Sequence, residues 1–354
     1  MGGSGAFLGP PMFLNKLMKA YEIREFGIDQ LSIVDRPTPE PRSGEVVVRF
    51  HAASLNYRDY MVVSGTYNPK MKLPAVPFSD GAGEVTAVGE GVTKWKAGDR
   101  VMPIFAQRWF DGDSSEEKRR TSLGAGAQWD GVLREYGSFS EESVVAIPEH
   151  LSYIEASTLP CAALTAWNAL AVSGKLKPGE YVLTLGTGGV SVFAAQFGMM
   201  FGARVISTSG SSGKIEKLNA LGVGETVNYR EREDWDTAVG EIVGKPGVDH
   251  VVEVGGADTL GRSINAVRIG GHVALIGALT GAAGFNPTAV FMKAIRLQGI
   301  FTGSRATFED MNKAITVNKM KPVVDRIFDF DQVREALRHM ESASHFGKIV
   351  VRID

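Results

Sequence analysis

A glycine-rich turn between an apolar strand and an apolar helix constrains the fold of this chain more than any other feature. Residues 181–185 (YVLTL) have the pattern of a buried strand, and residues 189–201 have that of a helix. The turn between them reads Gly186-Thr187-Gly188-Gly189-Val190. Gly186 permits a tight exit from the strand, and Gly188 permits close approach to a pyrophosphate at the helix N-terminus. The segment predicts a dinucleotide-binding fold, although Ser191 stands where the usual motif has a third glycine.

Helical and strand patterns alternate along the chain after residue 152. Apolar strands are expected at residues 181–185, 203–208, 248–254, 272–276 and 295–301. Helices are expected at 152–173, 189–201, 214–221 and 258–267, then at 306–319 and 332–342, before a closing strand at 345–353. Such alternation of helices with apolar strands indicates an α/β domain whose parallel sheet is covered on both faces.

Residues 19–150 read mostly as short strands with glycine-rich turns, which indicates a barrel-like or sandwich β domain. The polar stretch 107–131 interrupts this pattern and contains Trp109, Phe110 and Trp129. A loop of this length in a compact domain is usually a lid, a binding loop or a mobile segment. We expect a lid on the substrate side, with a solvated insertion as the alternative.

Composition excludes several classes of protein. The 354 residues suffice for two ordinary domains or one large one, and the net charge of −2 argues against nucleic acid or an anionic membrane as a partner. The single cysteine excludes an intrachain disulfide and any zinc site with two or more thiolates. With no N-x-[S/T] acceptor either, we expect a cytoplasmic protein. Residues 1–17 read as a tail or an added segment outside the fold.

The residues after the second strand of the α/β part bear on the choice of cofactor. An NAD site usually has an acidic residue there that binds the ribose 2′-hydroxyl. Residues 207–214 instead read STSGSSGK, which provides hydroxyls such as that of Ser209 and the ammonium of Lys214. Neither Asp nor Glu occurs between Ser207 and Glu216. Hydroxyls and a lysine suit a 2′-phosphate, so the sequence predicts NADP(H) in preference to NAD(H).

Three stretches in this order and spacing resemble the medium-chain dehydrogenase/reductase superfamily: residues 77–101, 156–167 and 181–191. Residues 54–59, 186–191 and 344–350 are similar to its zinc-independent alcohol dehydrogenase-like group, which is close to the quinone oxidoreductases. The resemblance covers roughly residues 19–354. It implies a GroES-like β-rich catalytic domain built from residues 18–155 and 301–354, around a Rossmann domain with a doubly wound parallel sheet at residues 156–300.

The resemblance also bears on zinc. Zinc-dependent members carry a cysteine where Asn56 stands, a His-Glu pair where Ser79 and Asp80 stand, and often a cysteine at the position of Cys161. A catalytic zinc needs about three protein ligands, and only Cys161 matches one. The structural four-cysteine lobe would fall near residues 107–131, which contain no cysteine. We therefore expect no metal site and no zinc.

Without a Lewis acid, hydrogen-bond donors must polarise the substrate oxygen. The resemblance points to Asn56 and Tyr57 as catalytic residues, with Asn56 orienting the substrate and Tyr57 donating a proton or a hydrogen bond. In the alternative reading, Tyr57 only packs and Asn56 only stabilises the turn. The resemblance further implies that Thr165 faces the cofactor, that Tyr229 lines the adenosine phosphate site, and that Gly277 and Phe301 lie near the nicotinamide.

These features predict a zinc-independent, NADP(H)-preferring oxidoreductase that transfers hydride between nicotinamide and a carbonyl compound or a conjugated enone, enal or quinone. An alcohol dehydrogenase or aldehyde reductase, and a non-catalytic NADP(H)-binding protein, stay open as alternatives. The expected partner is a small-molecule substrate, with neither nucleic acid nor membrane. Relatives commonly pair their Rossmann sheets edge to edge, which implies a homodimer or homotetramer joined through the strand at 295–301.

Overall fold

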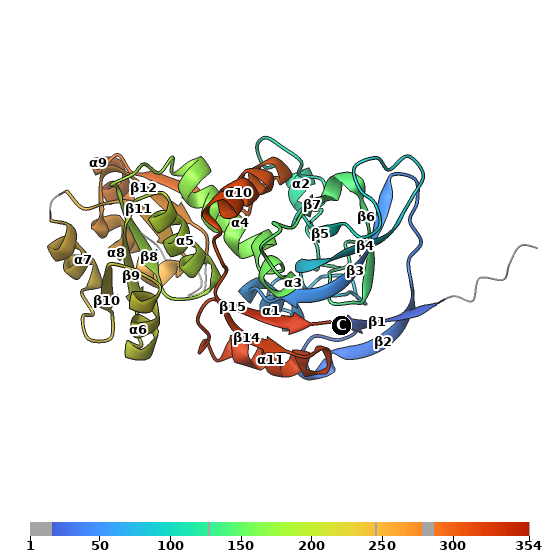
Figure 1. The fold of residues 1–354 in the computed structure, drawn as a ribbon. Helices are drawn as coiled ribbons and strands as arrows, with labels where there is room; N and C mark the ends of the chain where they lie inside the picture. Colours follow the sequence, from blue (N-terminus) through green and yellow to red (C-terminus); the bar gives the residue numbers. More distant parts are fainter. Residues whose placement is uncertain (1–15, 127, 245, 278–286, 354) are drawn as a thin grey trace, which may run out of the picture.

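The computed structural model describes residues 16–126, 128–244, 246–277 and 287–353. They form two lobes, one rich in β-strands and one with alternating helices and strands (Figure 1). The middle of the chain builds the α/β lobe, and both ends of the chain contribute to the β-rich lobe. The expected pairing of a β-rich domain built from both ends of the chain with a central α/β domain is thereby confirmed.

The α/β lobe is built on a six-stranded sheet in the order β10-β9-β8-β11-β12-β13. Every neighbouring pair is parallel. The strands are β8 (Tyr181–Leu185), β9 (Arg204–Ser209), β10 (Glu225–Asn228), β11 (Val248–Glu253), β12 (Val267–Leu275) and β13 (Arg296–Gly299). The strand order reverses direction between β8 and β11, and ligands of such sheets bind at the carboxyl ends of the strands beside this point.

Helices cover both faces of this sheet, as the apolar strands predicted. On one face α5 (Gly189–Met200) packs on β8 and β9, and α6 (Ser212–Ala220) packs on β9 and β10. On the other face α7 (Trp235–Val243) and α8 (Ala257–Ala266) enclose a core that contains Leu183 and Val251. The short α9 (Pro287–Met292) lies against α8.

The β-rich lobe joins the two ends of the chain in one sheet, in the order β14-β15-β3-β4-β5-β7, with β6 pairing with β3. These strands are β3 (Glu45–Ser54), β4 (Asp80–Val88), β5 (Arg100–Pro103), β6 (Tyr136–Ser140), β7 (Val144–Ala146), β14 (Val324–Phe328) and β15 (Lys348–Arg352). A separate ribbon pairs β1 (Leu17–Glu22) with β2 (Ser32–Pro37), so Leu17, which the sequence assigned to the tail, is part of a strand. Since β15 pairs with the end of β3, the C-terminal segment runs beside residues 55 and 56.

The segment expected as one helix at 152–173 is irregular. It consists of α3 (Tyr153–Ala156), a π-helical turn at Leu159–Ala163, α4 (Leu164–Trp167) and a second π-helical turn at Asn168–Ser173. Pro160 lacks the backbone N–H that a regular α-helix needs at that point. The apolar side chains of this segment belong to a core that also contains Met102 of the β-rich lobe and Phe197 of α5, so buried contacts join the two lobes.

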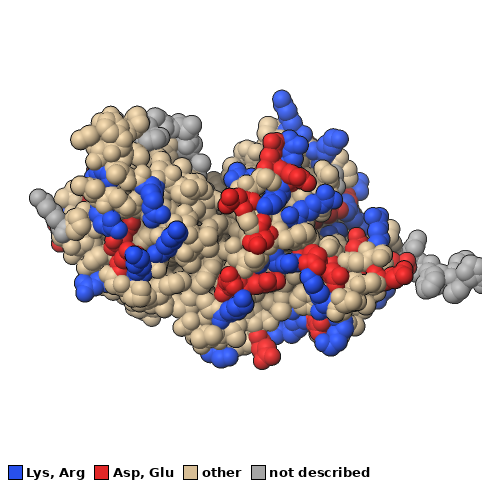
Figure 2. All heavy atoms as spheres, turned by 90° about the horizontal axis from the view of Figure 1, so that it is seen from above, with Lys and Arg blue, Asp and Glu red and all other residues tan. Residues whose placement is uncertain are grey.

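Beside three short 3-10 helices, four further α-helices lie in the described part of the chain: α1 (Tyr57–Val63), α2 (Glu116–Arg119), α10 (Arg305–Asn318) and α11 (Val333–Glu341). Basic and acidic side chains are interspersed on the face shown in Figure 2, which is hollowed between the two lobes. None of the helices in the described ranges is long and apolar enough to cross a membrane.

A buried chain of hydrogen bonds lies near the amino ends of the central strands. Glu180 bonds His250 Nε2 at 2.9 Å, His250 Nδ1 lies 3.5 Å from His272 Nδ1, and His272 Nε2 lies 3.0 Å from Ser173 Oγ. Both imidazoles are buried, at 3% and 1% exposure. Burial lowers the pKa of both histidines, that of His272 to about 4. Both rings are therefore neutral in the folded protein at pH 7.

We expect acidification to destabilise the protein through His272. As the pH falls, the His272 ring of the unfolded protein, with its pKa near 6.5, is protonated before the ring of the folded protein. The contribution of His272 to the unfolding free energy is therefore complete above pH 6.5 and is lost as the pH falls to about 4. A loss of about 1–3 kcal/mol in unfolding free energy is expected from this group, measured by urea denaturation at pH 5 and pH 7.5. The variant His272→Gln should show a shallower pH dependence, and identical slopes would contradict the assignment.

Candidate active site

The glycine-rich turn lies at the carboxyl end of β8 and leads into α5. Gly186 has a φ of +71°, and Gly188 is the residue before the first turn of the helix. A Cβ atom built on either glycine would meet no atom within 4 Å. Gly188, the N-cap residue, has no side chain with which to cap the helix start, and it forms a β-bridge with Gly347. This cradle fits a dinucleotide pyrophosphate, which a helix N-terminus binds through free N–H groups and its dipole.

The residues after Gly188 serve packing more than contact with a ligand. Ser191, which stands at the position of the usual third glycine, is buried. Its Oγ donates to the carbonyl of Leu185 at 2.6 Å and so links the helix to strand β8. Val190 packs against the core that the lobes share. Gly189 accommodates another segment, because a Cβ there would lie 2.6 Å from Cδ of Lys348.

The predicted adenosine end gathers at the carboxyl end of β9. Ser209 is buried, and its Oγ accepts from the N–H of Ser211 at 3.2 Å. The Tyr229 ring lies over Gly210, where a Cβ would come within 2.6 Å of it. Lys214 Nζ donates to the carbonyl of Ala343 at 2.7 Å, and burial lowers the pKa of this lysine. Lys214 thus bridges the two lobes, a contact that the sequence did not predict.

At the predicted nicotinamide end, Phe301 lies between Phe105, with ring centroids 5.7 Å apart, and Trp109 at 6.5 Å. The next residue, Thr302, has a φ of +37° and a buried hydroxyl without a partner in the described structure. Its carbonyl accepts from Asn168 at 2.6 Å. An orphaned hydroxyl beside an aromatic ring fits a ligand with polar edges, such as a nicotinamide carboxamide.

Two other predicted cofactor residues flank this end of the site. Thr165 is buried on α4. Gly277 follows β12 in the sequence and lies against the residue after β11. A Cβ atom built on it would lie 1.9 Å from the carbonyl oxygen of Val254. A larger residue at 277 therefore requires a shift of the backbone.

Asn56 is held in a network at the start of α1. Its backbone N–H donates to Asp59 Oδ2 at 2.8 Å, and its Oδ1 accepts from Lys348 Nζ at 2.6 Å. The amide Nδ2 lies 3.4 Å from Ser79 Oγ, which donates to Asp80 Oδ1 at 2.7 Å. Asp80 Oδ2 accepts from the backbone N–H of Cys161 at 3.0 Å. The residues at the positions of the zinc ligands of the zinc-dependent members therefore lie together, and Lys348 joins this group through Asn56.

Charge in this network is balanced by side chains of the protein. Burial raises the pKa of Asp59 to about 6 and also raises that of Asp80, while Lys348 acts in the opposite direction on both. Burial lowers the pKa of Lys348, and the Asp80 carboxylate opposes this shift. Burial next to Asp80 raises the pKa of the Cys161 thiol, which is therefore protonated at pH 7. Cys161 is partly exposed and packs against the Phe105 and Trp109 side of the site.

Lys348 is the residue that sequence reasoning missed. Its side chain is 2% exposed and donates to the carbonyl of Leu55 at 2.6 Å as well as to Asn56. The sequence contains one signal for this residue, a lysine at the start of the largely apolar strand pattern KIVVRI. Such a strand is expected to be buried, and a lysine is almost never fully buried unless it is paired.

Tyr57, the second predicted catalytic residue, is not part of this network. Its side chain is 41% exposed, its ring lies 5.6 Å from that of Tyr60, and no hydrogen bond to its hydroxyl is found among the described residues. The hydroxyl is open to solvent at the first residue of α1.

The loop at 107–131 packs on the nicotinamide end. Trp109 is buried against Phe301, and Arg119 of α2 lies 4.8 Å from the Phe301 ring centroid. The N–H of Arg305 donates to the carbonyl of Trp109 at 2.9 Å, which ties this loop to α10. Within the loop lies a cavity of about 430 Å³, lined by Arg108, Glu116, Glu117, Arg120, Thr121, Gln128 and Trp129.

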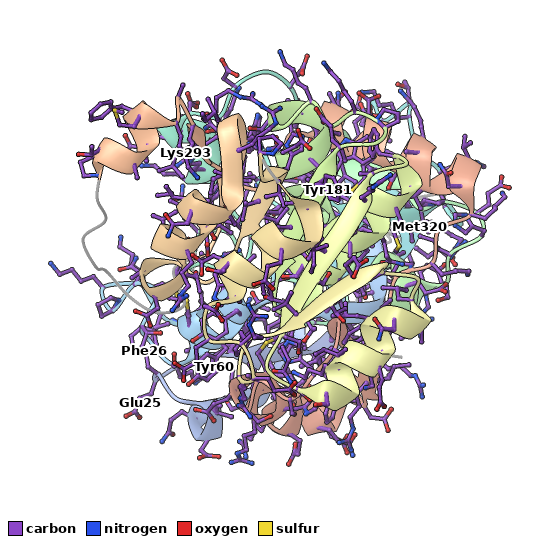
Figure 3. All side chains as sticks on the ribbon, turned by 90° about the vertical axis from the view of Figure 1, so that its left-hand side faces the viewer. Glu25, Phe26, Tyr60, Tyr181, Lys293 and Met320 are labelled. Carbon is purple, nitrogen blue, oxygen red and sulfur yellow. The ribbon has the colours of Figure 1, made fainter. Side chains whose placement is uncertain are left out.

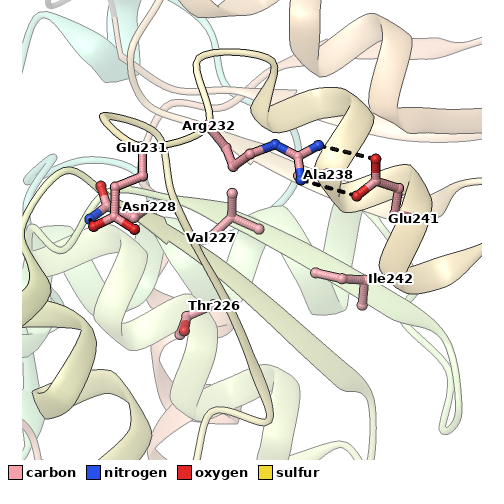
Figure 4. Close-up of a pocket in the computed structure, with 8 residues that line it drawn as sticks. All are labelled: Thr226, Val227, Asn228, Glu231, Arg232, Ala238, Glu241 and Ile242. Carbon is pink, nitrogen blue, oxygen red and sulfur yellow. Dashed lines mark hydrogen bonds and ion pairs between the residues drawn. The ribbon is translucent and has the colours of Figure 1, made fainter.

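A second cavity, of about 340 Å³, lies between β10 and α7 at the edge of the α/β sheet (Figure 4). The ion pair between Arg232 and Glu241, with 3.1 Å between Nη2 and Oε1, closes one side of it. None of the predicted site residues lines this cavity.

Comparison with known proteins identifies the class to which this fold and site belong. The family described as alcohol dehydrogenase GroES-like domain matches residues 42–149, and the family described as zinc-binding dehydrogenase matches residues 189–316. The chain belongs to the medium-chain dehydrogenase/reductase superfamily, in its group of alcohol dehydrogenase-like and quinone oxidoreductase-like proteins. It is an NAD(P)-dependent oxidoreductase.

Individual relatives match along almost their whole length. A zinc-type alcohol dehydrogenase-like protein of Schizosaccharomyces pombe is 39% identical over 337 residues, which span 93% of this chain and 96% of the relative. The quinone oxidoreductase of Sus scrofa is 28% identical over 348 residues, spanning 95% and 98%. The solved structure of an NAD-dependent alcohol dehydrogenase has a TM-score of 0.87 at 33% identity and covers 95% of this chain and 100% of its own.

The donor set at Asn56 is a poor fit for the zinc that some of these names imply. Asn56 and Ser79 offer an amide and a hydroxyl where zinc prefers thiolate, imidazole and carboxylate ligands. The Asp80 carboxylate is already bonded to Ser79 and to the N–H of Cys161, and the Lys348 ammonium is bonded to Asn56. In the part of the chain that the structure describes, no three His, Cys, Asp or Glu side chains lie close enough together to hold a metal ion.

Proposed function

We propose that this protein is a zinc-independent, NADP(H)-preferring reductase of conjugated enones, enals or quinones. The observation that carries the proposal is the fixed amide of Asn56, whose Oδ1 is bound to Lys348. Nδ2 is then the donor end of the amide, on the side of Ser79 Oγ at 3.4 Å and of Asp80, and we infer that a substrate oxygen takes the place of the distant Ser79 contact. Such a donor suffices for a conjugated substrate, because the negative charge that develops on reduction is delocalised onto the carbonyl oxygen.

A nicotinamide cofactor held at the turn of Gly186 and Gly188 would supply a hydride to the β-carbon of the substrate. The electron pair of the C=C bond then moves to the carbonyl oxygen as an enolate, which Asn56 Nδ2–H stabilises. Tyr57 donates its hydroxyl proton to the α-carbon and recovers a proton from the solvent to which it is exposed. Phe301 and Trp109 form the apolar wall beside these groups.

The test is consumption of NADPH by chelator-treated protein with matched substrate pairs. A conjugated enone such as 3-penten-2-one is compared with its saturated ketone, 2-pentanone, and metal content is measured on the same sample. We expect turnover of the enone, little turnover of the ketone, and less than one zinc in ten chains. Equal turnover of the ketone would favour the alcohol dehydrogenase alternative. Tight cofactor binding without any turnover would favour a non-catalytic protein.

Replacing Lys214 by alanine is expected to weaken NADPH binding by about 10- to 100-fold and to leave NADH binding within about twofold, because a 2′-phosphate loses a charge-assisted partner. Quenching of protein fluorescence measures both dissociation constants. Lys217, also on α6, provides the matched control, since its ammonium faces Asp325 at 3.9 Å. Equal losses for both cofactors in Lys214→Ala would show that the bond to Ala343 matters for the fold alone.

We also propose a homodimer formed through β13. This strand pairs only with β12 among the described residues, and an edge strand offers free N–H and C=O groups to a second chain. Phe291, Met292 and Ile269 near it are each 68% or 69% exposed. Lys293, at the margin of the α/β lobe in Figure 3, donates to the carbonyls of Ile264, Asn265 and Val267 and so anchors α9 beside this edge.

The change Phe291→Asp is expected to raise the dimer dissociation constant at least about tenfold, because a charge on an apolar contact must be desolvated. Sedimentation velocity over a range of protein concentrations measures this. Val317→Asp, at an exposed apolar residue on α10, is the control and should leave the association state unchanged. A monomeric wild type at all concentrations would refute the proposal.

A further inference from the structure

Lys348 connects the cofactor turn of one lobe with Asn56 of the other. The backbone N–H of Gly347 donates to the carbonyl of Thr187 at 3.0 Å, and Gly347 and Gly188 form a β-bridge. The aliphatic stem of Lys348 then crosses the first residue of α5, as the 2.6 Å approach of its Cδ to a Cβ placed on Gly189 shows. Its ammonium ends at Leu55 and Asn56, 2.6 Å from an oxygen of each.

The chemistry of the ammonium determines how the Asn56 amide is oriented. A lysine ammonium only donates hydrogen bonds, so the amide atom at 2.6 Å from it must be the oxygen. Nδ2 is therefore on the opposite side, where Ser79 Oγ at 3.4 Å is a distant partner for one of its two hydrogens. The Asp80 carboxylate lies on the same side and is a further acceptor for this amide. Without Lys348, rotation by 180° would be open to the amide, and it would present an acceptor in place of a donor.

We propose that Lys348 is a positioning residue that locks the Asn56 amide with its N–H toward the substrate. Since the stem of the lysine rests on the cofactor turn, this donor is held at a set position relative to the site of the dinucleotide. The role of the donor in reduction rests on the proposed function, whereas the orientation of the amide does not.

The orientation is tested without any substrate. In protein labelled with ¹⁵N-asparagine, the side-chain signals of Asn56 are assigned by their loss in Asn56→Ala. We expect Lys348→Met, which keeps the stem and removes the ammonium, to shift these signals and to speed their exchange with solvent about tenfold, because a buried, charge-assisted hydrogen bond is lost. Unchanged signals in the folded variant would overturn the proposal whether or not the protein reduces enones.

The consequence for turnover is tested by a double-mutant cycle of Lys348→Met and Asn56→Ala. We expect Lys348→Met to lower kcat for the enone about 10- to 100-fold in the wild type but less than about twofold when Asn56 is alanine, since one residue acts through the other. The dissociation constant for NADPH should change less than about threefold. Independent, multiplicative losses, or a loss confined to NADPH affinity, would overturn the proposal. If Lys348→Met does not fold, both tests are made in the Asp80→Asn background, which removes the charge left without a partner.

Discussion

Replacement of Asn56 by alanine is expected to lower kcat for a conjugated enone by about 10²–10³-fold, the usual cost of losing one donor to a developing oxyanion. Hydride transfer is the step that should become slower, because Asn56 Nδ2 is the fixed donor to the developing oxyanion. Tyr57 has no hydrogen bond to Asn56 and contacts Tyr60 instead. The affinity for NADPH should stay within about twofold, since Asn56 contributes to neither end of the dinucleotide cradle. Single-turnover oxidation of NADPH, followed at 340 nm, measures the step directly.

Two variants make this experiment specific. Asn68→Ala removes an exposed amide from the same lobe and should leave turnover unchanged. Tyr57→Phe should slow the protonation instead and remove the solvent isotope effect on that step. If Asn56→Ala keeps more than half of the wild-type kcat, the amide is a structural group and the proposed polarisation is wrong.

The second large effect concerns stability. Lys348→Met is expected to lower the free energy of unfolding by about 3–5 kcal/mol, the range observed when one partner of a buried charge pair is removed. Lys348 is 2% exposed and Asp80 is fully buried, and the positive charge of Lys348 opposes the desolvation of this carboxyl, so water cannot replace the ammonium. Urea denaturation at pH 7 measures the loss.

The double variant Asp80→Asn with Lys348→Met should recover most of that stability, because no uncompensated charge is then left between the lobes. Lys313→Met serves as the control, since this lysine pairs with Asp310 on the exposed face of α10 and exposed pairs contribute about 0–1 kcal/mol. A loss of less than about 1 kcal/mol in Lys348→Met would show that Asp80 is already protonated in the folded protein.

Much of the architecture was accessible from local patterns. The alternation of apolar strands with helices after residue 152 predicted the parallel sheet, and the glycine-rich turn predicted its carboxyl-end cradle, as the structure has them. These features depend on residues close together in sequence, where the period of the side chains and the conformational needs of glycine act directly. The irregular course of 152–173 was not predicted, because the core shared by both lobes outweighs the local preference for one regular helix.

The sequence by itself determined the alternation of strands and helices after residue 152, apart from elements such as β10 and α7, which were not predicted. It also determined the position of the cofactor turn and the residue types available at Asn56, Ser79 and Cys161. Only the tertiary structure decided that Lys348 meets Asn56, 292 positions earlier in the chain, and that Lys214 reaches the carbonyl of Ala343. Both contacts depend on β15 pairing with β3 and on the docking of residue 347 against the glycine-rich turn. Burial in that junction sets the charge states of Asp80, Cys161 and Lys348, because desolvation depends on the surroundings that distant segments provide and not on neighbours in the sequence.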